Sequence, residues 1–292
     1  MEPKPKDAVL ISQEKQMNPT EKAIVGSKRK ICPRCNRPTP RTCLCEALPE
    51  QRIRLEKTII LVLQHPHEIK MKNRSIPILE LCLDPECLVL CVGRRLGDKD
   101  IDDSISKLLQ PPNLPILLFP ADEKEKDGAT NPLSLTEVKE KVGSEELLLQ
   151  DGGKVVLVAL DATWKFAKEM HKANIEHKQY PSQMVLASLQ PQDFPVGWTS
   201  GRFSIRTTPT DSEPSRSSYM STAECITLAV SKLEYEKEET QTEFYSTLMK
   251  PLDLMVEQWR SFITNPKVRI KKKKKTAHST REDQSSPSSS IW

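Results

Sequence analysis

The chain of 292 residues contains no long hydrophobic run. No apolar stretch approaches the roughly 18–20 residues that a helix needs to cross a bilayer, so we expect no transmembrane helix. The first residues, MEPKPKDAVLISQEKQ, also lack the apolar core of a secretory signal. We therefore expect an intracellular protein, in the cytoplasm, the nucleus or both. Its eight cysteines should then be thiols or metal ligands rather than disulfides.

Net charge is also small, because 44 basic residues against 40 acidic ones leave a formal charge of +4. This average says little about partners. The distribution says more, since residues 267–275 (KVRIKKKKK) place seven cations in nine positions whereas residues 234–243 are acidic. Such a lysine run is typical of a nuclear address or of an RNA-binding tail, and the sequence leaves both open.

Four segments are predicted from composition and pattern. Hydrophobic residues at 37% and charged residues at 29% indicate a globular centre with polar flanks. The lysine-rich residues 1–29 and the basic, serine-rich residues 264–292 are predicted to be disordered. Residues 30–50 form a small four-cysteine module, and residues 51–263 form one larger domain.

Short apolar runs alternate with helical patterns through this larger domain. Strands are predicted at 58–64, 87–93, 114–120, 154–160 and 183–188. Helices are predicted at 75–83, 132–142, 164–174, 221–236 and 244–263. Asn131 is the predicted cap of the second helix, and Pro251 marks a kink or a new start in the last one. Near-continuous apolar strands alternating with helices predict an α/β fold, a mostly parallel sheet with helices on both faces.

Four cysteines fall within 14 residues in the pattern C-x2-C-x7-C-x-C. Four thiolates at this spacing suit a closed, structural zinc site, because no coordination position is left open for chemistry. The alternatives are four free thiols or a redox pair, and the intracellular context favours metal. The predicted ligands are Cys32, Cys35, Cys43 and Cys45. Arg34, Arg37 and Arg41 belong to the same loop and either contact phosphates or form a solvated charged face.

The stretch KVVLVALDATWKFAKEM joins the strongest predicted strand to a helix. Ligands of open α/β sheets bind outside the carboxyl ends of the strands, and Asp161 follows such an end. Its carboxylate can accept a proton, Thr163 can cap the helix, and Trp164 can stack on a base or a sulfonium ion. In the alternative interpretation, Asp161 or Thr163 is only a helix cap and Trp164 only a core residue.

Two further segments place polar residues at predicted element ends. Ser221-x-x-Glu224 predicts a capping box, whose helix N-terminus suits a carboxylate or phosphate. QHPHE (64–68) follows a strand, and its two histidines favour a turn around Pro66 over catalysis. Arg74, Arg94 and Arg95, with Asn73 beside them, place cations at the same edge of the sheet, where they are either ion-paired or facing an anion. The segment before the capping box carries Arg202, Arg206 and Arg216 among many hydroxyl residues.

Taken in order, these segments resemble the DTW-domain family, which is named for its Asp-x-Thr-Trp motif. The resemblance covers residues 32 to about 260 and rests on the cysteine pattern, QHPHE, VGRR, LLFP, LDATW, IRTTPT and STAE. It is closest to members with an N-terminal zinc cluster, which are tRNA-uridine aminocarboxypropyltransferases. One departure is the stretch DSEPSRSSYM, which is longer and richer in serine than the family pattern and leaves Arg216 without an assigned role.

The resemblance implies a fold related to the knotted SPOUT methyltransferases, with residues 51–263 as the catalytic domain. It implies S-adenosylmethionine as co-substrate and tRNA as partner, while oligomeric state stays open. The 3-amino-3-carboxypropyl group would pass to N3 of a uridine, generally in the D-loop, with release of 5′-methylthioadenosine. Three alternatives are methyl transfer to RNA, pseudouridine in ribosomal RNA as the acceptor, and a non-catalytic zinc-containing RNA-binding protein.

The resemblance also assigns residues. Asp161, Thr163 and Trp164 are the expected catalytic residues, with Asp161 as base and Trp164 as a stacking platform. The co-substrate would lie among Phe119, Pro120, Asp161, Trp164, Ser221, Thr222 and Glu224. RNA would be bound by Arg34, Arg37, Arg41, Arg94, Arg95, Arg202 and Arg206.

Overall fold

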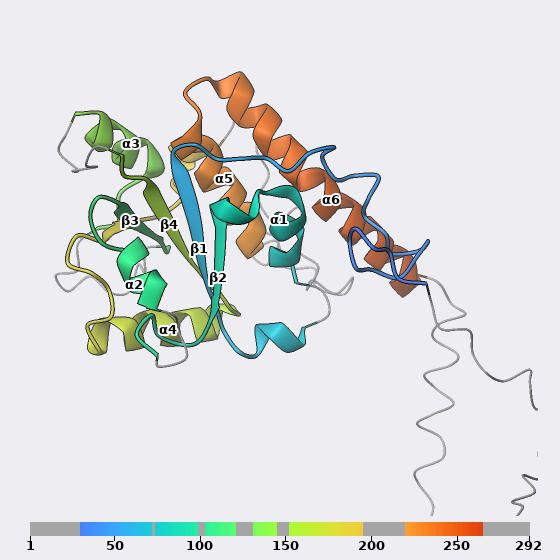
Figure 1. The fold of residues 1–292 in the computed structure, drawn as a ribbon, viewed down its shortest axis with the longest axis horizontal. Coiled ribbons are helices and arrows are strands. Elements are labelled where there is room, and N and C mark those ends of the chain that lie inside the picture. The colour runs from blue at the N-terminus through green and yellow to red at the C-terminus, as the bar shows by residue number, and fades with distance from the viewer. Residues whose placement is uncertain are drawn as a thin grey trace, which may run out of the picture.

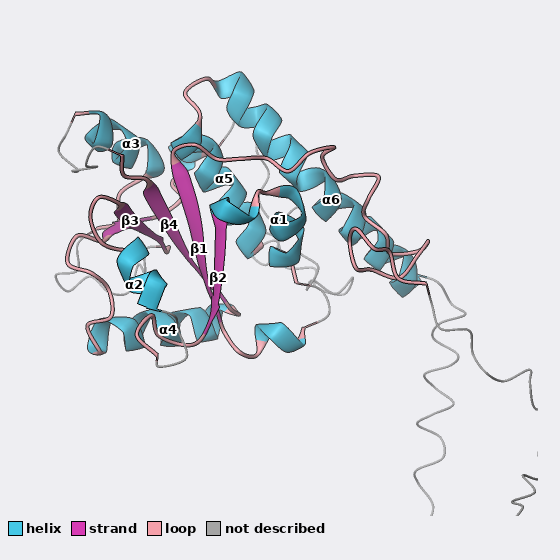
Figure 2. Cartoon of the chain, viewed as in Figure 1, coloured by secondary structure: helices cyan, strands magenta, loops and turns pink. Residues whose placement is uncertain are grey.

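The computed structural model describes residues 30–71, 74–98, 103–120, 131–144, 152–194 and 220–264 (Figure 2). Of the residues singled out above, Asn73, Arg202, Arg206 and Arg216 lie outside the described residues, as do segments 1–29 and 265–292. Within the described ranges, no helix is both long enough and apolar enough to cross a membrane.

Five strands form one sheet in which every neighbouring pair is parallel, in the order β2-β1-β4-β3-β5 (Figure 1). The strands are β1 (Thr58–Gln64), β2 (Leu88–Val92), β3 (Leu114–Leu118), β4 (Val155–Asp161) and β5 (Val185–Ala187). All seven residues of β4 are buried, which explains its unbroken apolar run. The prediction of a mostly parallel sheet is confirmed.

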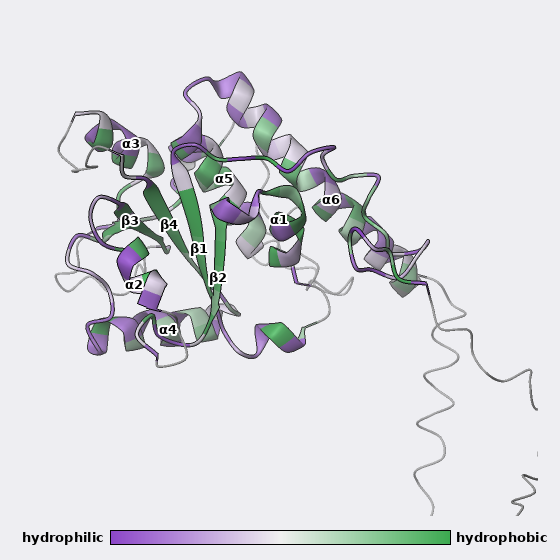
Figure 3. Cartoon of the chain, in the orientation of Figure 1, coloured by the Kyte–Doolittle hydropathy of each residue, from purple (hydrophilic) through white to green (hydrophobic). Residues whose placement is uncertain are grey.

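Helices cover both faces of the sheet, as predicted. The described helices are α1 (Ile76–Cys82), α2 (Asp103–Leu108), α3 (Leu135–Gly143), α4 (Trp164–Glu176), α5 (Thr222–Glu234) and α6 (Glu238–Thr264), with short 3-10 turns η2 (Glu68–Lys70), η3 (Pro85–Cys87) and η4 (Pro191–Asp193). Alternate residues of β1 point to opposite faces. Ile60 and Val62 pack in a core with α1, α3, α5 and α6, whereas Leu61 and Leu63 pack with α2 and α4. Figure 3 shows the strands as strongly hydrophobic, with α1, α5 and α6 to one side of them and α2 to the other.

Two helix predictions were wrong in their details. Helix α3 is capped by Ser134 rather than Asn131, because Ser134 and Glu137 form a capping box that satisfies two backbone N–H groups. The last helix is a single element that begins at Glu238, so the acidic segment belongs partly to it and Pro251 lies inside it. Glu238 and Glu239 stand in its first turn, where the helix dipole favours negative charge.

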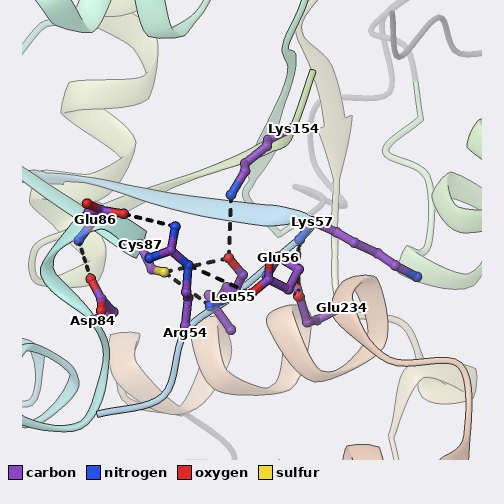
Figure 4. A network of polar contacts seen from close by, with 9 residues as sticks. All are labelled: Arg54, Leu55, Glu56, Lys57, Asp84, Glu86, Cys87, Lys154 and Glu234. Atoms are coloured by element: carbon purple, nitrogen blue, oxygen red, sulfur yellow. Dashed lines mark hydrogen bonds and ion pairs between the residues drawn. The ribbon is translucent and has the colours of Figure 1, made fainter. Parts of the chain in front are cut away.

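Helix α5 runs antiparallel to the strands, and its C-terminal end is held at the start of β1 (Figure 4). The buried Glu234 carboxylate accepts the backbone N–H groups of Glu56 at 2.5 Å and of Lys57 at 3.1 Å. Thirteen helical residues span about 20 Å, and the seven residues of β1 about 23 Å. The N-terminus of α5 therefore lies at the carboxyl edge of the sheet.

Replacing Glu234 with alanine is expected to lower the free energy of unfolding by about 1–3 kcal/mol, because the backbone N–H groups of Glu56 and Lys57 lose their acceptor. Glu236 is the matched control. Its carboxylate pairs with Lys57 and Lys139, but its side chain is 66% exposed, so Glu236→Ala should cost less than about 1 kcal/mol. Urea unfolding of the two variants measures both values. Equal losses would show that Glu234 does not anchor α5.

The SPOUT-like knot stays a prediction. Tracing a knot requires the continuous path of the chain, and several connections, among them residues 121–130 and 195–219, lie outside the described residues. The all-parallel sheet and its strand order stand independently of the knot.

Candidate active site and metal centre

Asp161 is the last residue of β4 and lies beside Gln64, the last residue of β1. Both side chains are buried, and the Gln64 amide nitrogen donates a hydrogen bond of 2.7 Å to Oδ2 of Asp161. The backbone N–H of His65 donates to the Asp161 carbonyl at 2.9 Å. Asp161 is therefore neither a helix cap nor a surface carboxylate. Its carboxylate is oriented by the Gln64 hydrogen bond and lies at the carboxyl edge of β1 and β4.

The N-terminus of α5 lies on the same side of the sheet. Alternation along β1 and β4 puts Gln64 and Asp161 in line with Val62 and Ala159, which belong to the core beneath α5. The predicted capping box is present, since the Glu224 N–H donates to Ser221 Oγ at 3.2 Å and the Ser221 N–H donates to Glu224 Oε2 at 3.3 Å. This edge thus combines a carboxylate with the positive end of a helix dipole.

The start of α1 contacts the N-terminus of α5. The Ala223 N–H donates to Oγ of Ser75, the N-cap residue of α1, at 3.4 Å. Thr222 opens α5 and is half-buried between Ser221 and Ala223. The segment before α5 lies outside the described residues, so the contacts of Arg202, Arg206 and Arg216 stay untested.

An aromatic row lies on the other face of the sheet, at the same edge. Trp164 stacks on Phe119 with ring centroids 5.6 Å apart, and Phe119 stacks on His171 at 4.2 Å. His171 Nδ1 is 3.1 Å from the Tyr180 hydroxyl, and burial raises the pKa of Tyr180. Trp164 is 44% exposed, so it is not the core residue of the alternative interpretation. Phe119 is buried, and the exposed Pro120 follows it directly after β3.

Trp164 and Asp161 are joined by the short loop into α4. Thr163 occupies the N-cap position, but its hydroxyl makes no capping hydrogen bond. The Lys168 ammonium lies over the Trp164 ring, 5.1 Å from the centroid, as a cation–π contact. The start of α4 therefore presents the Thr163 hydroxyl, which makes no capping hydrogen bond, beside the exposed indole of Trp164.

The QHPHE segment makes a turn, as predicted. The Glu68 N–H donates to the His65 carbonyl at 2.8 Å, and His65 Nδ1 accepts the His67 N–H at 3.2 Å. The His65 ring stacks on Phe166 with centroids 4.5 Å apart. Burial lowers the pKa of His65, and the positive charge of Arg94 acts in the same direction. The lowered pKa favours the neutral ring, which contributes packing to this edge.

The VGRR arginines follow β2 at the same edge. Arg94 is exposed, whereas Arg95 is paired with Asp98, which its guanidinium contacts at 2.8 Å. Of the two, Arg94 is the better placed to meet an anion.

The four cysteines of the N-terminal segment meet in space. Their sulfur atoms all lie within 4.8 Å of one another. Tetrahedral zinc, with bonds of about 2.3 Å, requires sulfur atoms about 3.8 Å apart. Hydrogen bonds from the Cys35 backbone N–H and the Cys45 thiol lower the pKa of Cys32 to about 6, whereas burial and the hydrogen bond to Cys32 raise the pKa of Cys45 to about 12. The close approach of the four sulfur atoms, rather than these opposed shifts, is what suits a metal ion. The cluster could therefore hold a metal ion, and its members are the four cysteines predicted as ligands: Cys32, Cys35, Cys43 and Cys45.

The cysteine loop is fastened to α6. The Arg37 guanidinium lies 3.0 Å from Sδ of Met255, and burial lowers the pKa of Arg37. The Gln258 amide donates to the Cys43 carbonyl at 3.0 Å. Arg34 and Arg41 are exposed, although Arg34 also donates to the Pro49 carbonyl at 2.6 Å. Arg37 thus faces the protein, whereas the other two arginines remain open to a partner.

Several residues at the carboxyl edge of the sheet, near Asp161 and Trp164, were not predicted as site residues. They are Gln64, Phe166, His171 and Tyr180. Gln64 had a signal, because it begins QHPHE directly after a buried strand. The other three stand in or after a helix without any local pattern that separates them from ordinary core residues.

Fold and site together define a parallel α/β domain with a polar carboxyl edge and a four-cysteine cluster able to hold a metal ion. Residues 29–260 match the DTW domain, and the chain belongs to this family.

Curated relatives carry the name tRNA-uridine aminocarboxypropyltransferase. The tRNA-uridine aminocarboxypropyltransferase 2 of Mus musculus is 27% identical to this chain over 231 residues, which are 79% of this chain and 63% of the relative. The enzyme of the same name in Drosophila melanogaster is 28% identical over 227 residues, which are 77% of this chain and 73% of the relative. The tRNA-uridine aminocarboxypropyltransferase A of Arabidopsis thaliana is 32% identical over 147 residues, which are 50% of this chain and 52% of the relative. The chain thus spans less than two thirds of the mouse relative. No solved structure matches it.

Proposed function

We propose that this protein transfers the 3-amino-3-carboxypropyl group of S-adenosylmethionine to N3 of a tRNA uridine in the D-loop. The observation that carries the proposal is the held carboxylate of Asp161, at the carboxyl edge beside the N-terminus of α5, in a chain of the DTW family. The names of its relatives supply the substrate class.

The chemistry is a displacement at carbon. S-adenosylmethionine supplies a carbon activated by its sulfonium, so the N3–C bond forms as the C–S bond breaks and neutral 5′-methylthioadenosine leaves. The protein must take up the proton of N3, which is weakly acidic, and a positioned base supplies that step. Asp161 is the residue that we assign to it, since its carboxylate already stands where ligands of open α/β sheets bind.

The neighbouring groups suit the other parts of the donor. The N-terminus of α5, with Ser221 and Thr222, is suited to the amino acid carboxylate, and Glu224 keeps this end capped. The exposed Trp164, supported by the buried Phe119 ring, offers a π face for the sulfonium or a base, with Pro120 at the rim. The hydroxyl of Thr163 makes no capping bond and can meet substrate.

Exposed cations would hold the tRNA phosphates. Arg34 and Arg41 on the cysteine loop and Arg94 beside the active edge are the described candidates. Arg37 supports the loop, and Arg95 is tied to Asp98. Arg202, Arg206 and the lysine run stay candidates outside the described residues. Because phosphate contacts release counterions, tRNA affinity should fall steeply as salt rises.

Purified protein incubated with unmodified tRNA and S-adenosylmethionine tests the proposal. The expected result is acp3U among the digested nucleosides and an equal amount of 5′-methylthioadenosine. S-adenosylhomocysteine with a methylated base would assign the protein to methyl transfer instead. Calorimetry that finds tRNA binding but no S-adenosylmethionine binding would make it a non-catalytic RNA-binding protein.

A further inference from the structure

The hydrogen bond between Gln64 and Asp161 joins two residues that are 97 positions apart in the chain. Both backbones are fixed independently of it. The Gly93 N–H donates to the Gln64 carbonyl at 3.1 Å, and the His65 N–H donates to the Asp161 carbonyl at 2.9 Å. Because β1 and β4 are in register at these two residues, neither strand can shift without breaking several sheet hydrogen bonds.

The Gln64 side chain therefore has little freedom. It is 5% exposed, and its amide nitrogen lies 2.7 Å from Oδ2 of Asp161. Among the described residues, this is the hydrogen bond that the Asp161 side chain receives, and it occupies Oδ2 and restricts the rotation of the carboxylate. An amide also suits this position electrostatically. A lysine or arginine would strongly favour the ionised carboxylate and weaken it as a base, whereas an amide orients it without a full charge.

We propose that Gln64 is a positioning residue for the transfer reaction, which holds Asp161 so that Oδ1 faces the proton of uridine N3. This inference rests on the proposed function. Gln64 does not touch the reacting atoms. It acts through Asp161, in the way that outer hydrogen-bond partners orient the groups that perform chemistry.

Two substitutions separate positioning from structure. Gln64→Met keeps the size of the side chain but removes the donor, and we expect kcat to fall about 10- to 100-fold with little change in the KM for tRNA. Gln64→Glu places a second carboxylate within hydrogen-bond distance of the first. Such a pair shares one proton, so the acidic limb of the pH–kcat profile should move to higher pH. The other titratable or charged groups on elements that meet here, His65, Arg74, Arg94 and Glu224, are unchanged in both variants.

Gln241→Met is the matched control. Gln241 is also a buried glutamine, and its amide donates to the Tyr235 carbonyl at 2.9 Å, near the opposite edge of the sheet. It should keep the kcat and pH profile of the unmodified protein. If Gln64→Met and Gln64→Glu lose activity only in proportion to their folded fraction, with an unchanged pH profile, Gln64 has a structural role alone and the inference is overturned.

A second measurement does not depend on turnover. The carboxyl 13C chemical shift of Asp161 can be compared at one pH in the unmodified protein and in Gln64→Met, where loss of the donor should move the resonance. An unchanged resonance overturns the inference even when no transfer is detected. Absence of acp3U with the unmodified protein would instead contradict the proposed function, so the two failures are distinguishable.

Discussion

Replacing Asp161 with asparagine is expected to lower the turnover number for uridine modification by about 100- to 10,000-fold, the usual contribution of a positioned general base. Asparagine has nearly the same size and can still accept the hydrogen bond from Gln64, so the buried edge should stay packed. An amide cannot take up the N3 proton. The loss should therefore fall on kcat, and tRNA affinity should change little.

Nucleoside mass spectrometry in single-turnover reactions measures this effect. Asp84→Asn is the matched control, because Asp84 is also an aspartate that accepts a hydrogen bond, from the Glu86 N–H, but lies at η3, before β2 begins. That variant should keep full activity. Normal turnover by Asp161→Asn, with tRNA still bound, would remove Asp161 from the role of base and leave it as a pocket residue.

Replacing Cys35 with serine is expected to abolish zinc binding and to detach the cysteine loop from α6. Four thiolates form a closed set, and zinc binding contributes on the order of 10 kcal/mol to the folding of small zinc modules. Cys35 is buried in the same core as Leu44, Leu48 and Met255. Loss of the metal should therefore lower the melting temperature and weaken tRNA binding through Arg34 and Arg41.

Metal analysis and thermal unfolding test this expectation. The unmodified protein should carry one zinc per chain and lose thermal stability when a chelator is added, whereas Cys35→Ser should carry none and not respond. Cys91→Ser is the control, since Cys91 is buried in the other core, where its thiol donates to the Val62 carbonyl. It should retain zinc. A metal-free protein of undiminished stability would show that the cysteines are ordinary thiols.

Local patterns in the sequence determined much of this protein. The apolar run of β4 predicted a strand buried on both faces, and the Ser221–Glu224 spacing predicted the capping box that begins α5. The cysteine spacing predicted the cluster that the structure brings together. Each of these depends on residues close in the chain, whose geometry follows from strand or helix periodicity and from the short reach of a loop.

The tertiary structure decided what depends on strand order and on distant pairs. Asp161 could have been only a helix cap by sequence, and β1 beside β4 gave its carboxylate the partner Gln64, 97 residues away. Arg37 had the same local context as its neighbours, and contact with Met255, 218 residues away, turned it inward. Such pairs are not encoded by any local spacing, because they form only when the sheet and α6 bring separate segments together.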